Sequence, residues 1–272
     1  MKWRGIIGAI TFFTFCPFLS AQEGRLKVHF INVGYGDSIL LENPDKTTWL
    51  IDAAQEKKGQ ALWAYLKKHK IRSLDRVFIT HPHENHFGGL NLLIKKIRIK
   101  EILITKDPNP DPGFERLLKK FESKGIPVTF IKQGSVLSDV KHIKLDFLNP
   151  DNFQGSLNDN SLVTFLTHGK ISFLLTADIG PEKQEELVKN FPEIRAANLV
   201  QIPHHGLPVQ EPFLKTFGKN TVFVVSTGLS PYNPSGIEVP EGLEKILRTD
   251  RHGDIVAVSD GGSIQVFYGL SQ

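Results

Sequence analysis

Sulfur-containing side chains are scarce in this chain, whose 272 residues include one cysteine and one methionine. The cysteine, Cys16, lies in an apolar segment near the start of the sequence. A single thiol cannot form a disulfide within the chain, so a disulfide-stabilised scaffold is excluded. A chain of this length can instead rely on a large hydrophobic core for its stability.

Long hydrophobic runs are also lacking. The most apolar stretch, from Ile6 to Leu19, is shorter than the roughly twenty residues that a transmembrane helix needs. It follows Lys2 and Arg4 and ends at Ser20-Ala21, which is the pattern of a secretory signal peptide. We therefore expect a leader over residues 1–21, cleaved near Ala21. Residues 22–272 would then form one secreted or periplasmic domain without stable membrane insertion. An uncleaved anchor and a buried N-terminal helix are the alternatives.

The sequence has only a small excess of positive over negative charge. The formal net charge is +4, and it falls to +2 when Lys2 and Arg4 are removed with the leader. A basic cluster at Lys95, Lys96, Arg98 and Lys100 has the composition of a solvated face. Charge therefore gives little support to a nucleic-acid partner. Hydrophobic content of 40% and charged content of 23% are typical of a globular protein.

Short apolar segments alternate with helical patterns along the whole chain. β-branched or alternating residues predict strands at 26–33, 38–41, 47–52, 76–80, 101–105, 128–132, 143–148, 161–167, 171–175, 198–202, 221–225, 254–258 and 262–267. Spacing of apolar residues predicts helices at 61–69, 89–96, 114–123, 181–189 and 236–248, with Pro181 in a first helical turn. Strand groups with interleaved helices in both halves predict an α/β (α+β) protein with two mixed sheets face to face and helices outside.

Histidines gather at the end of one predicted strand. His81, His83 and His86 follow strand 76–80 and precede Gly88-Gly89. Pro82 prevents a helical turn between the first two, so their imidazoles can converge on one ion only from an extended or looped backbone. Open α/β sheets carry their functional groups at such carboxyl ends of strands.

A second histidine pair, His204-His205, follows the apolar run at 199–203. Imidazole is the commonest metal ligand in proteins, and we expect the two histidine segments to form one metal site. Nitrogen and oxygen donors without thiolates favour Zn²⁺, as one or two ions. Mn²⁺ is the alternative if carboxylates dominate.

Seven motifs occur in an order that resembles the metallo-β-lactamase superfamily, in particular the branch related to the periplasmic domain of ComEC-type DNA-uptake proteins. They extend over nearly the whole chain after the leader and lie at Asn32–Ser38, Leu50–Ala53, His81–Gly89, Asn158–Ser161, Leu175–Asp178, Ile202–Gly206 and Arg248–Gly253. The resemblance implies a four-layer αββα sandwich with metal between the sheet edges.

The resemblance also implies roles for individual residues. His81 and His83 would bind one metal, and His86 would bind a second together with His204 or His205, of which we favour His204. Asp178 would bridge the two metals. Its alternative role is that of an N-cap for the helix that starts near Pro181.

Three further polar residues match the pattern at the edge of the implied site. Asp37 could cap the glycine-rich turn around it or support a histidine ligand. Asp52 is expected to order the turn beneath the site. Asn160 stands where other branches carry a third histidine, and we expect it to form hydrogen bonds at the site edge.

The sequence departs from the family pattern at two positions. Asn85 replaces the aspartate that usually precedes the last histidine of the loop, and Val239-Pro240 replaces a His-Pro pair. An amide binds metal weakly and cannot accept a proton, so the second metal should be held less tightly.

These observations predict a metal-dependent hydrolase. The resemblance implies phosphodiesterase or nuclease-like activity on a small-molecule or phosphodiester substrate, with Asp178, Asn85 and His205 near the reacting groups. The alternatives are an acyl hydrolase of lactones or β-lactams, and a catalytically weak metal-binding or surface binding protein.

Overall fold

Two β-sheets pack face to face in the computed structural model, which describes residues 8–12, 24–107, 111–153, 155–207, 209–228 and 246–269. The first sheet has the strand order β1 (Gly8–Phe12), β18 (Ile264–Tyr268), β17 (Ile255–Ser259), β2 (Leu26–Phe30), β3 (Ile39–Glu42), β4 (Thr48–Ile51), β6 (Arg76–Ile79), β8 (Ile102–Ile104) and β9 (Val128–Phe130). The second has the order β10 (Val136–Leu137), β11 (Ile143–Asn149), β12 (Val163–His168), β13 (Ile171–Leu175), β14 (Leu199–Gln201), β15 (Val222–Val225) and β16 (Ile246–Arg248).

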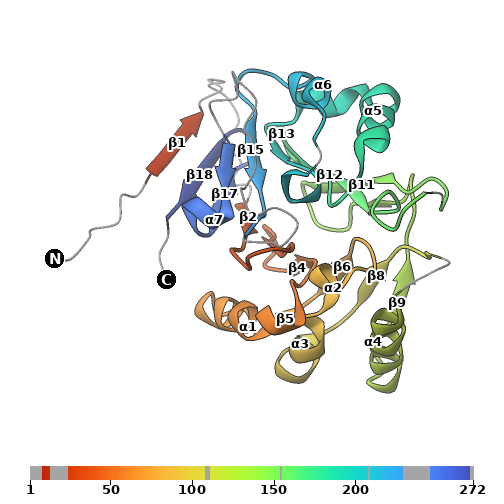
Figure 1. The fold of residues 1–272 in the computed structure, drawn as a ribbon. Helices are drawn as coiled ribbons and strands as arrows, with labels where there is room; N and C mark the ends of the chain where they lie inside the picture. Colours follow the sequence, from red (N-terminus) through yellow and green to blue (C-terminus); the bar gives the residue numbers. More distant parts are fainter. Residues whose placement is uncertain are drawn as a thin grey trace.

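Helices cover the outer faces of both sheets (Figure 1). The first sheet carries α1 (Gly59–Lys68), α3 (Leu90–Lys96) and α4 (Pro112–Ser123), and the second carries α5 (Pro181–Asn190) and α6 (Glu211–Lys215). Shorter elements are α2 (Glu84–Phe87), α7 (Thr249–His252), the strand pair β5 (Ser73–Leu74) and β7 (Arg98–Ile99), and the 3₁₀ turns at Glu56–Lys58, Pro192–Ala196 and His204–Gly206. The four-layer αββα arrangement predicted from the sequence is confirmed.

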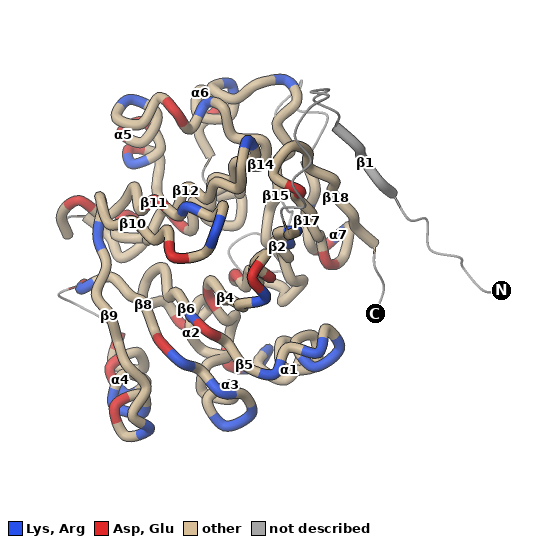
Figure 2. The backbone as a smooth tube through the Cα atoms, turned by 180° about the vertical axis from the view of Figure 1, so that it is seen from behind, with Lys and Arg blue, Asp and Glu red and all other residues tan. Residues whose placement is uncertain are grey.

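Three hydrophobic clusters hold these layers together. The central cluster lies between the sheets and includes the buried side chains of Phe30, Trp49, Phe78, Phe147 and Phe173. A second cluster joins the first sheet to α1, α3 and α4, and a third joins the second sheet to α5 and α6. Both acidic and basic residues occur along α4 and α5 (Figure 2), whereas the buried residues of α4 include Phe114, Leu117 and Phe121. Apolar faces are thus turned inward in every layer.

Each sheet contains a parallel half, and this topology places the candidate site. Strands β4, β6, β8 and β9 are parallel neighbours, as are β13, β14, β15 and β16. Parallel strands end at a common sheet edge, so the residues that follow β4, β6, β13 and β14 come together there. These are the segments that contain Asp52, His81, Asp178 and His204.

The predicted strands agree with the observed ones to within a few residues, but one predicted helix is partly wrong. Residues Ile246–Arg248 form strand β16 beside β15 rather than the end of a helix. An Ile-Leu pair fits a buried strand as well as a helix, and pairing with β15 decides between them. The rest of the predicted helix lies outside the described residues. Helix α4 begins at Pro112, earlier than predicted, where Asp111 Oδ1 accepts a hydrogen bond from the Gly113 N–H at 2.6 Å.

The predicted leader overlaps strand β1, which pairs antiparallel with β18 at the edge of the first sheet. The remaining residues of that segment lie outside the described ranges, and the signal peptide stays a prediction. Among the residues that the structure describes, no helix has the length and apolar character needed to cross a membrane.

We expect the half-buried carboxylate of Glu42 to make the folded protein less stable in acid. Hydrogen bonding to His29, and also to Lys27, lowers the pKa of Glu42 from 4.5 to about 2, against the effect of burial. Because the folded-state pKa is the lower one, this stabilisation is complete above about pH 4.5 and is lost as the pH falls towards 2. After screening by solvent we expect it to be about 1–2 kcal/mol.

Urea unfolding of chelator-treated wild type and Glu42→Gln at pH 6 and pH 3 measures this contribution. The wild type should be the more stable protein at pH 6, and the difference should shrink at pH 3. An equal difference at both pH values would contradict the assignment.

Candidate metal centre

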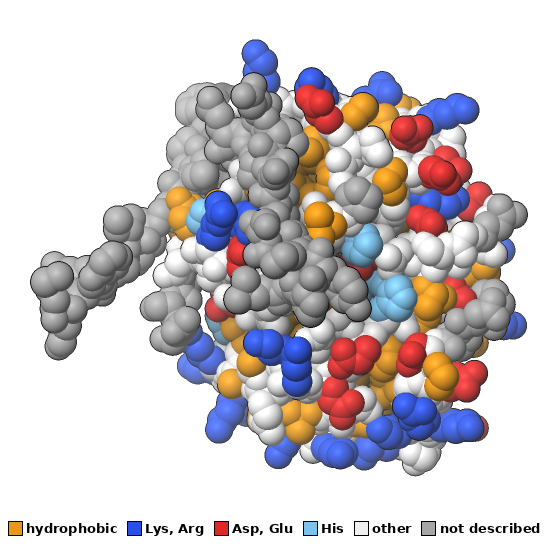
Figure 3. Space-filling model, viewed as in Figure 1, with side chains coloured by type: hydrophobic (Ala, Val, Ile, Leu, Met, Phe, Trp, Pro, Cys, Tyr) orange, Lys and Arg blue, Asp and Glu red, His pale blue; other side chains and the backbone are white. Residues whose placement is uncertain are grey.

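The candidate site lies where the carboxyl ends of β6, β13 and β14 meet. Thr80 follows β6 and leads directly into His81, while the peptide from His83 to His86 turns into the short helix α2. Asp178 lies three residues beyond β13, and His204 and His205 form the 3₁₀ turn after β14. Histidine side chains are visible near the middle of the molecule in the space-filling view (Figure 3).

One carboxylate oxygen lies at the centre of the site. Asp178 Oδ2 is 3.2 Å from His86 Nε2, 3.5 Å from His205 Nε2, 3.8 Å from His81 Nε2 and 3.9 Å from His204 Nε2. Only 2% of Asp178 is exposed, and His81, His86 and His205 are equally buried. Four imidazoles from two distant chain segments thus surround a single buried carboxylate.

His83 completes the arrangement on the solvent side. Its Nδ1 lies 2.9 Å from His81 Nε2, and the two rings meet edge to face with centroids 4.7 Å apart. Zinc–nitrogen bonds of about 2.0–2.1 Å place two tetrahedral ligand nitrogens about 3.3 Å apart, so the observed spacing is close to that of two ligands of one ion. His83 and His204 are half-buried, and Asn158 contacts both of them.

Asp52 fixes His86 from behind. Its Oδ2 lies 2.7 Å from His86 Nδ1 and accepts a hydrogen bond from the Thr80 hydroxyl at 2.7 Å, while its Oδ1 accepts from the Thr80 N–H at 2.8 Å. With His86 Nδ1 held by a carboxylate, Nε2 is left to face Asp178. A carboxylate behind a ligand histidine fixes its tautomer and makes it a stronger donor.

His205 is held in a similar way on the opposite side. Its Nδ1 donates to the Ser226 carbonyl oxygen at 2.9 Å and lies 3.8 Å from Asp37 Oδ1. Asp37 is itself fixed by Gln201, whose Nε2 donates to Asp37 Oδ2 at 2.7 Å. His205 Nε2 therefore faces the centre, where the Asn85 side-chain nitrogen also lies 3.0 Å away.

Backbone strain is concentrated around the site. Among the described residues, eight other than glycine have a positive φ, and five of these flank the centre: Asp52, Ala54, Ala177, His204 and His205. This left-handed conformation is unfavourable for residues with a Cβ atom and persists only where the surrounding structure enforces it. Such concentration is typical of a functional site.

Burial and mutual charge determine the protonation of these groups. Burial lowers the pKa of His81 well below 6.5, and His86 acts in the same direction. Burial alone would also lower the pKa of His86, but Asp178 and Asp52 raise it well above 6.5. Burial would raise the pKa of Asp178, yet His205 and His86 hold it well below 3.8. The site thus combines an anionic carboxylate with a neutral imidazole, both of which can donate electron pairs to a metal.

The residues present fit a bound metal ion. Asp178 Oδ1 and Asp37 Oδ1 are buried and have no hydrogen-bonding partner among the described residues. His81, His86 and Asp178 offer ligand atoms within 4.8 Å of one another, as do Asp37, Asp178 and His205, and Asp37, Asp52 and His86. Imidazole and carboxylate donors without thiolates suit Zn²⁺ and also Mn²⁺.

The structure brings nearly all the predicted site residues together. His81, His83, His86, Asp178, His204 and His205 surround the centre, with Asn85, Asp37 and Asp52 beside them. Asn160 lies at the edge, where its Nδ2 donates to Asp107 Oδ2 at 2.8 Å. Asp178 does not cap α5, whose N-cap is Gly180, so the alternative structural role for Asp178 is wrong.

Of His204 and His205, His205 is better placed to bind a metal, although the sequence favours His204. His205 is 2% exposed and its Nδ1 is anchored to a carbonyl oxygen, whereas the His204 side chain is 26% exposed. Both have Nε2 within 4 Å of Asp178.

Several residues that support the site have roles that the sequence alone does not reveal. Thr80 ties Asp52 to the base of the histidine loop, and Gln201 holds Asp37 across the gap between the sheets. Ser161, the last residue of the motif Asn158–Ser161, has its Oγ 3.2 Å from His81 Nδ1. Thr80 could have been suspected from its place next to His81, and Gln201 from being a polar residue in an apolar strand. The motif marks Ser161 but does not indicate its contact with His81.

Comparison with known proteins identifies the class. The profile of the metallo-beta-lactamase superfamily matches residues 31–190, which contain the histidine loop and Asp178. The chain belongs to this superfamily. Its buried histidine and aspartate residues form a site of the kind that such metal-dependent hydrolases use.

Individual relatives are more distant. The chain is 27% identical over 279 aligned positions to ComE operon protein 3 of Bacillus subtilis, and the match covers 94% of this chain and 35% of that protein. The chain thus spans about a third of the length of this relative. Among solved structures, a protein from Parabacteroides distasonis assigned as a metal-dependent hydrolase superposes with a TM-score of 0.52 at 14% identity, covering 89% of this chain and 98% of that one.

The contact between Asp52 and His86 predicts that an isosteric substitution of Asp52 weakens metal binding. Asp52→Asn keeps the shape but removes the charge behind His86 Nδ1, so metal affinity should fall by about 10- to 100-fold. Competition with a chelator of known zinc affinity measures the change. Asp45→Asn, at an exposed turn, is the matched control. Equal affinities in the two variants would show that Asp52 does not act on the metal centre.

Proposed function

We propose that this protein is an exported phosphodiesterase that hydrolyses its substrate at one or two zinc ions. The observation that carries this proposal is the approach of four imidazole nitrogens to Asp178 Oδ2 within 3.9 Å. A divalent metal bound there supplies a Lewis acid and lowers the pKa of a coordinated water, which is the chemistry that phosphodiester hydrolysis requires.

The residues would divide this work by position. His81 and His83 would hold one ion, and His86 and His205 would hold the second, with Asp178 between them. Asp52 and Asp37 would keep the imidazoles oriented from behind. Because the site opens through the half-buried His83 and His204, substrate would approach from that side.

The choice of a phosphodiester rather than an acyl substrate rests on the motif resemblance described above. ComE operon protein 3 matches nearly the whole of this chain, and the motifs resemble the branch related to DNA-uptake proteins. Nucleic acid is accordingly one candidate substrate. Export is proposed from the leader-like segment at residues 1–21.

A substrate panel tests the proposal. Bis(p-nitrophenyl) phosphate, a chromogenic lactone and a chromogenic β-lactam should be compared with zinc or manganese added. We expect hydrolysis of the phosphodiester, its loss in His81→Ala and its retention in the exposed-site control His142→Ala. Preferential hydrolysis of the lactone or the β-lactam would show an acyl hydrolase instead.

A further inference from the structure

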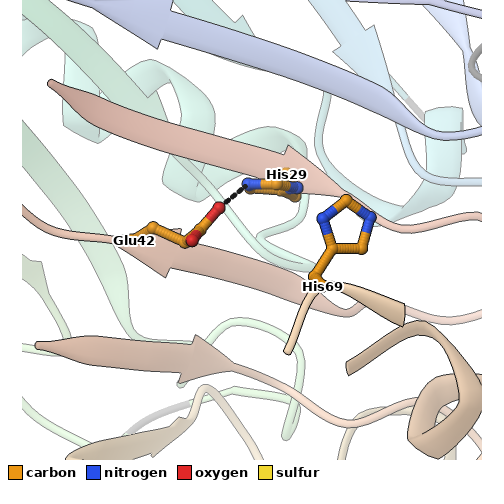
Figure 4. Close-up of side chains that lie close together, drawn as sticks. All are labelled: His29, Glu42 and His69. Atoms are coloured by element: carbon orange, nitrogen blue, oxygen red, sulfur yellow. Dashed lines mark hydrogen bonds and ion pairs between the residues drawn. The ribbon is translucent and has the colours of Figure 1, made fainter. Parts of the chain in front are cut away.

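A second group of metal-ligand side chains lies on the outer face of the first sheet. His29 on β2 and Glu42 on β3 lie close to His69, the residue that follows helix α1 (Figure 4). His29 Nε2 lies 3.0 Å from Glu42 Oε1. The three residues offer ligand atoms that all lie within 4.8 Å of one another.

This group is separate from the candidate metal centre. Val28 and Phe30, the neighbours of His29, belong to the core between the two sheets. Side chains alternate along a strand, so His29 faces the opposite way, towards α1. His29 is 1% exposed, whereas Glu42 and His69 are half-buried and leave an approach from solvent.

Tyr65 fixes both imidazoles. Its hydroxyl lies 2.8 Å from His29 Nδ1, and its ring stacks on His69 with centroids 4.3 Å apart. A tyrosine hydroxyl can donate or accept. It can therefore donate to Nδ1 while Nε2–H faces Glu42, or accept from Nδ1–H and leave the Nε2 lone pair for a metal. When a cation replaces the proton at Nε2, the neutral ring carries its proton on Nδ1, which donates to the Tyr65 hydroxyl and preserves the contact.

We propose that His29 Nε2, Glu42 Oε1 and one ring nitrogen of His69 form a second zinc site. Two imidazoles and one carboxylate are a common zinc ligand set, with water as the fourth ligand. Zinc bonds of about 2.0–2.2 Å separate tetrahedral ligands by about 3.3 Å, close to the 3.0 Å observed for the first pair. Ring nitrogens of His69 have no hydrogen bond within the described part of the chain, and one of them already lies within 4.8 Å of the other two ligand atoms. The ion would join the end of α1 to β2 and β3.

Substitution of Lys27 tests the proposal by a gain of zinc affinity. Its Nζ donates to the same Glu42 Oε1 at 3.0 Å, and its side chain is 44% exposed. An ammonium group competes with a metal for that oxygen. Lys27→Ala should therefore strengthen zinc binding. If the three residues form only a hydrogen-bonded network, no zinc binds there and Lys27→Ala has no effect on zinc binding.

Zinc stoichiometry of the full chain tests the site, measured by equilibrium dialysis with elemental analysis. His69→Ala and Glu42→Gln should each lose one equivalent relative to wild type, and His142→Ala, which removes an exposed imidazole elsewhere, should lose none. The same equivalent should remain in His81→Ala, in which the candidate metal centre is disrupted. Tyr65→Phe should weaken it by about 10- to 100-fold, as expected for a group that orients a ligand.

Cobalt substitution provides a second readout that does not depend on enzymatic activity. His81→Ala should bind Co²⁺ with visible absorption bands of tetrahedral type, and these should disappear when His69→Ala is added. Equal zinc content in His69→Ala, Glu42→Gln and His142→Ala would overturn the proposal and leave a hydrogen-bonded cluster only. Because these experiments measure bound metal and not turnover, their result is independent of whether the protein hydrolyses phosphodiesters.

Discussion

Replacement of Asp178 by asparagine should remove most of the metal from the candidate centre and abolish hydrolysis. The change keeps the shape of the side chain but removes the carboxylate charge that lies within 3.9 Å of all four imidazoles. Loss of one partner from a buried charged network costs about 3–5 kcal/mol, which corresponds to a decrease in metal affinity on the order of 10²- to 10⁴-fold.

Zinc content after dialysis and the rate of bis(p-nitrophenyl) phosphate hydrolysis measure this effect. Asp151→Asn, which removes a carboxylate from an exposed turn, is the control. Circular dichroism of Asp178→Asn should show that the fold is retained. Wild-type zinc content in Asp178→Asn would mean that Asp178 is not a ligand.

Conversion of Asn85 to aspartate should have the largest opposite effect. The Asn85 side-chain nitrogen lies 3.0 Å from His205 Nε2, at the position where the family usually supplies a carboxylate. A carboxylate there would add an anionic ligand on the side of His205 and His86. An anionic carboxylate attracts a divalent cation more strongly than a neutral amide does, so we expect affinity for the second metal and turnover to rise by about 10-fold or more.

Metal stoichiometry measured on protein purified without chelator distinguishes the alternatives. A rise in both bound metal and turnover in Asn85→Asp, but not in the surface control Asn152→Asp, would identify a weakened enzyme. Two metals and efficient hydrolysis in the wild type would contradict our view that Asn85 weakens the site. A gain of metal without turnover would favour a metal-binding protein that does not catalyse hydrolysis.

Periodicity in the sequence was sufficient to predict most of the fold. Strands such as Ile171–Leu175 are short apolar segments bounded by turn residues, and the helix at Pro181 carries its own start signal. Ile246–Arg248 could not be assigned in this way because a three-residue apolar strand has no periodicity of its own. Its state depends on pairing with β15, which is a tertiary interaction.

Motifs identified the ligand candidates but not the contacts that orient them. His81 and Asp178 are recognisable from local residues, whereas Gln201 reaches Asp37 across 164 positions of sequence. The choice between His204 and His205 also depends on long-range contacts, since Ser226 anchors His205. His29, Glu42 and His69 carry no local motif and are joined only by the pairing of β2 with β3 and the docking of α1.

Crystals grown with zinc and measured at the zinc absorption edge would test the central claim most directly. The account predicts an anomalous peak about 2.0–2.2 Å from an oxygen of Asp178 and from at least two of the surrounding imidazole nitrogens. Density for zinc elsewhere, with Asp178 and His81 both uncoordinated, would contradict it.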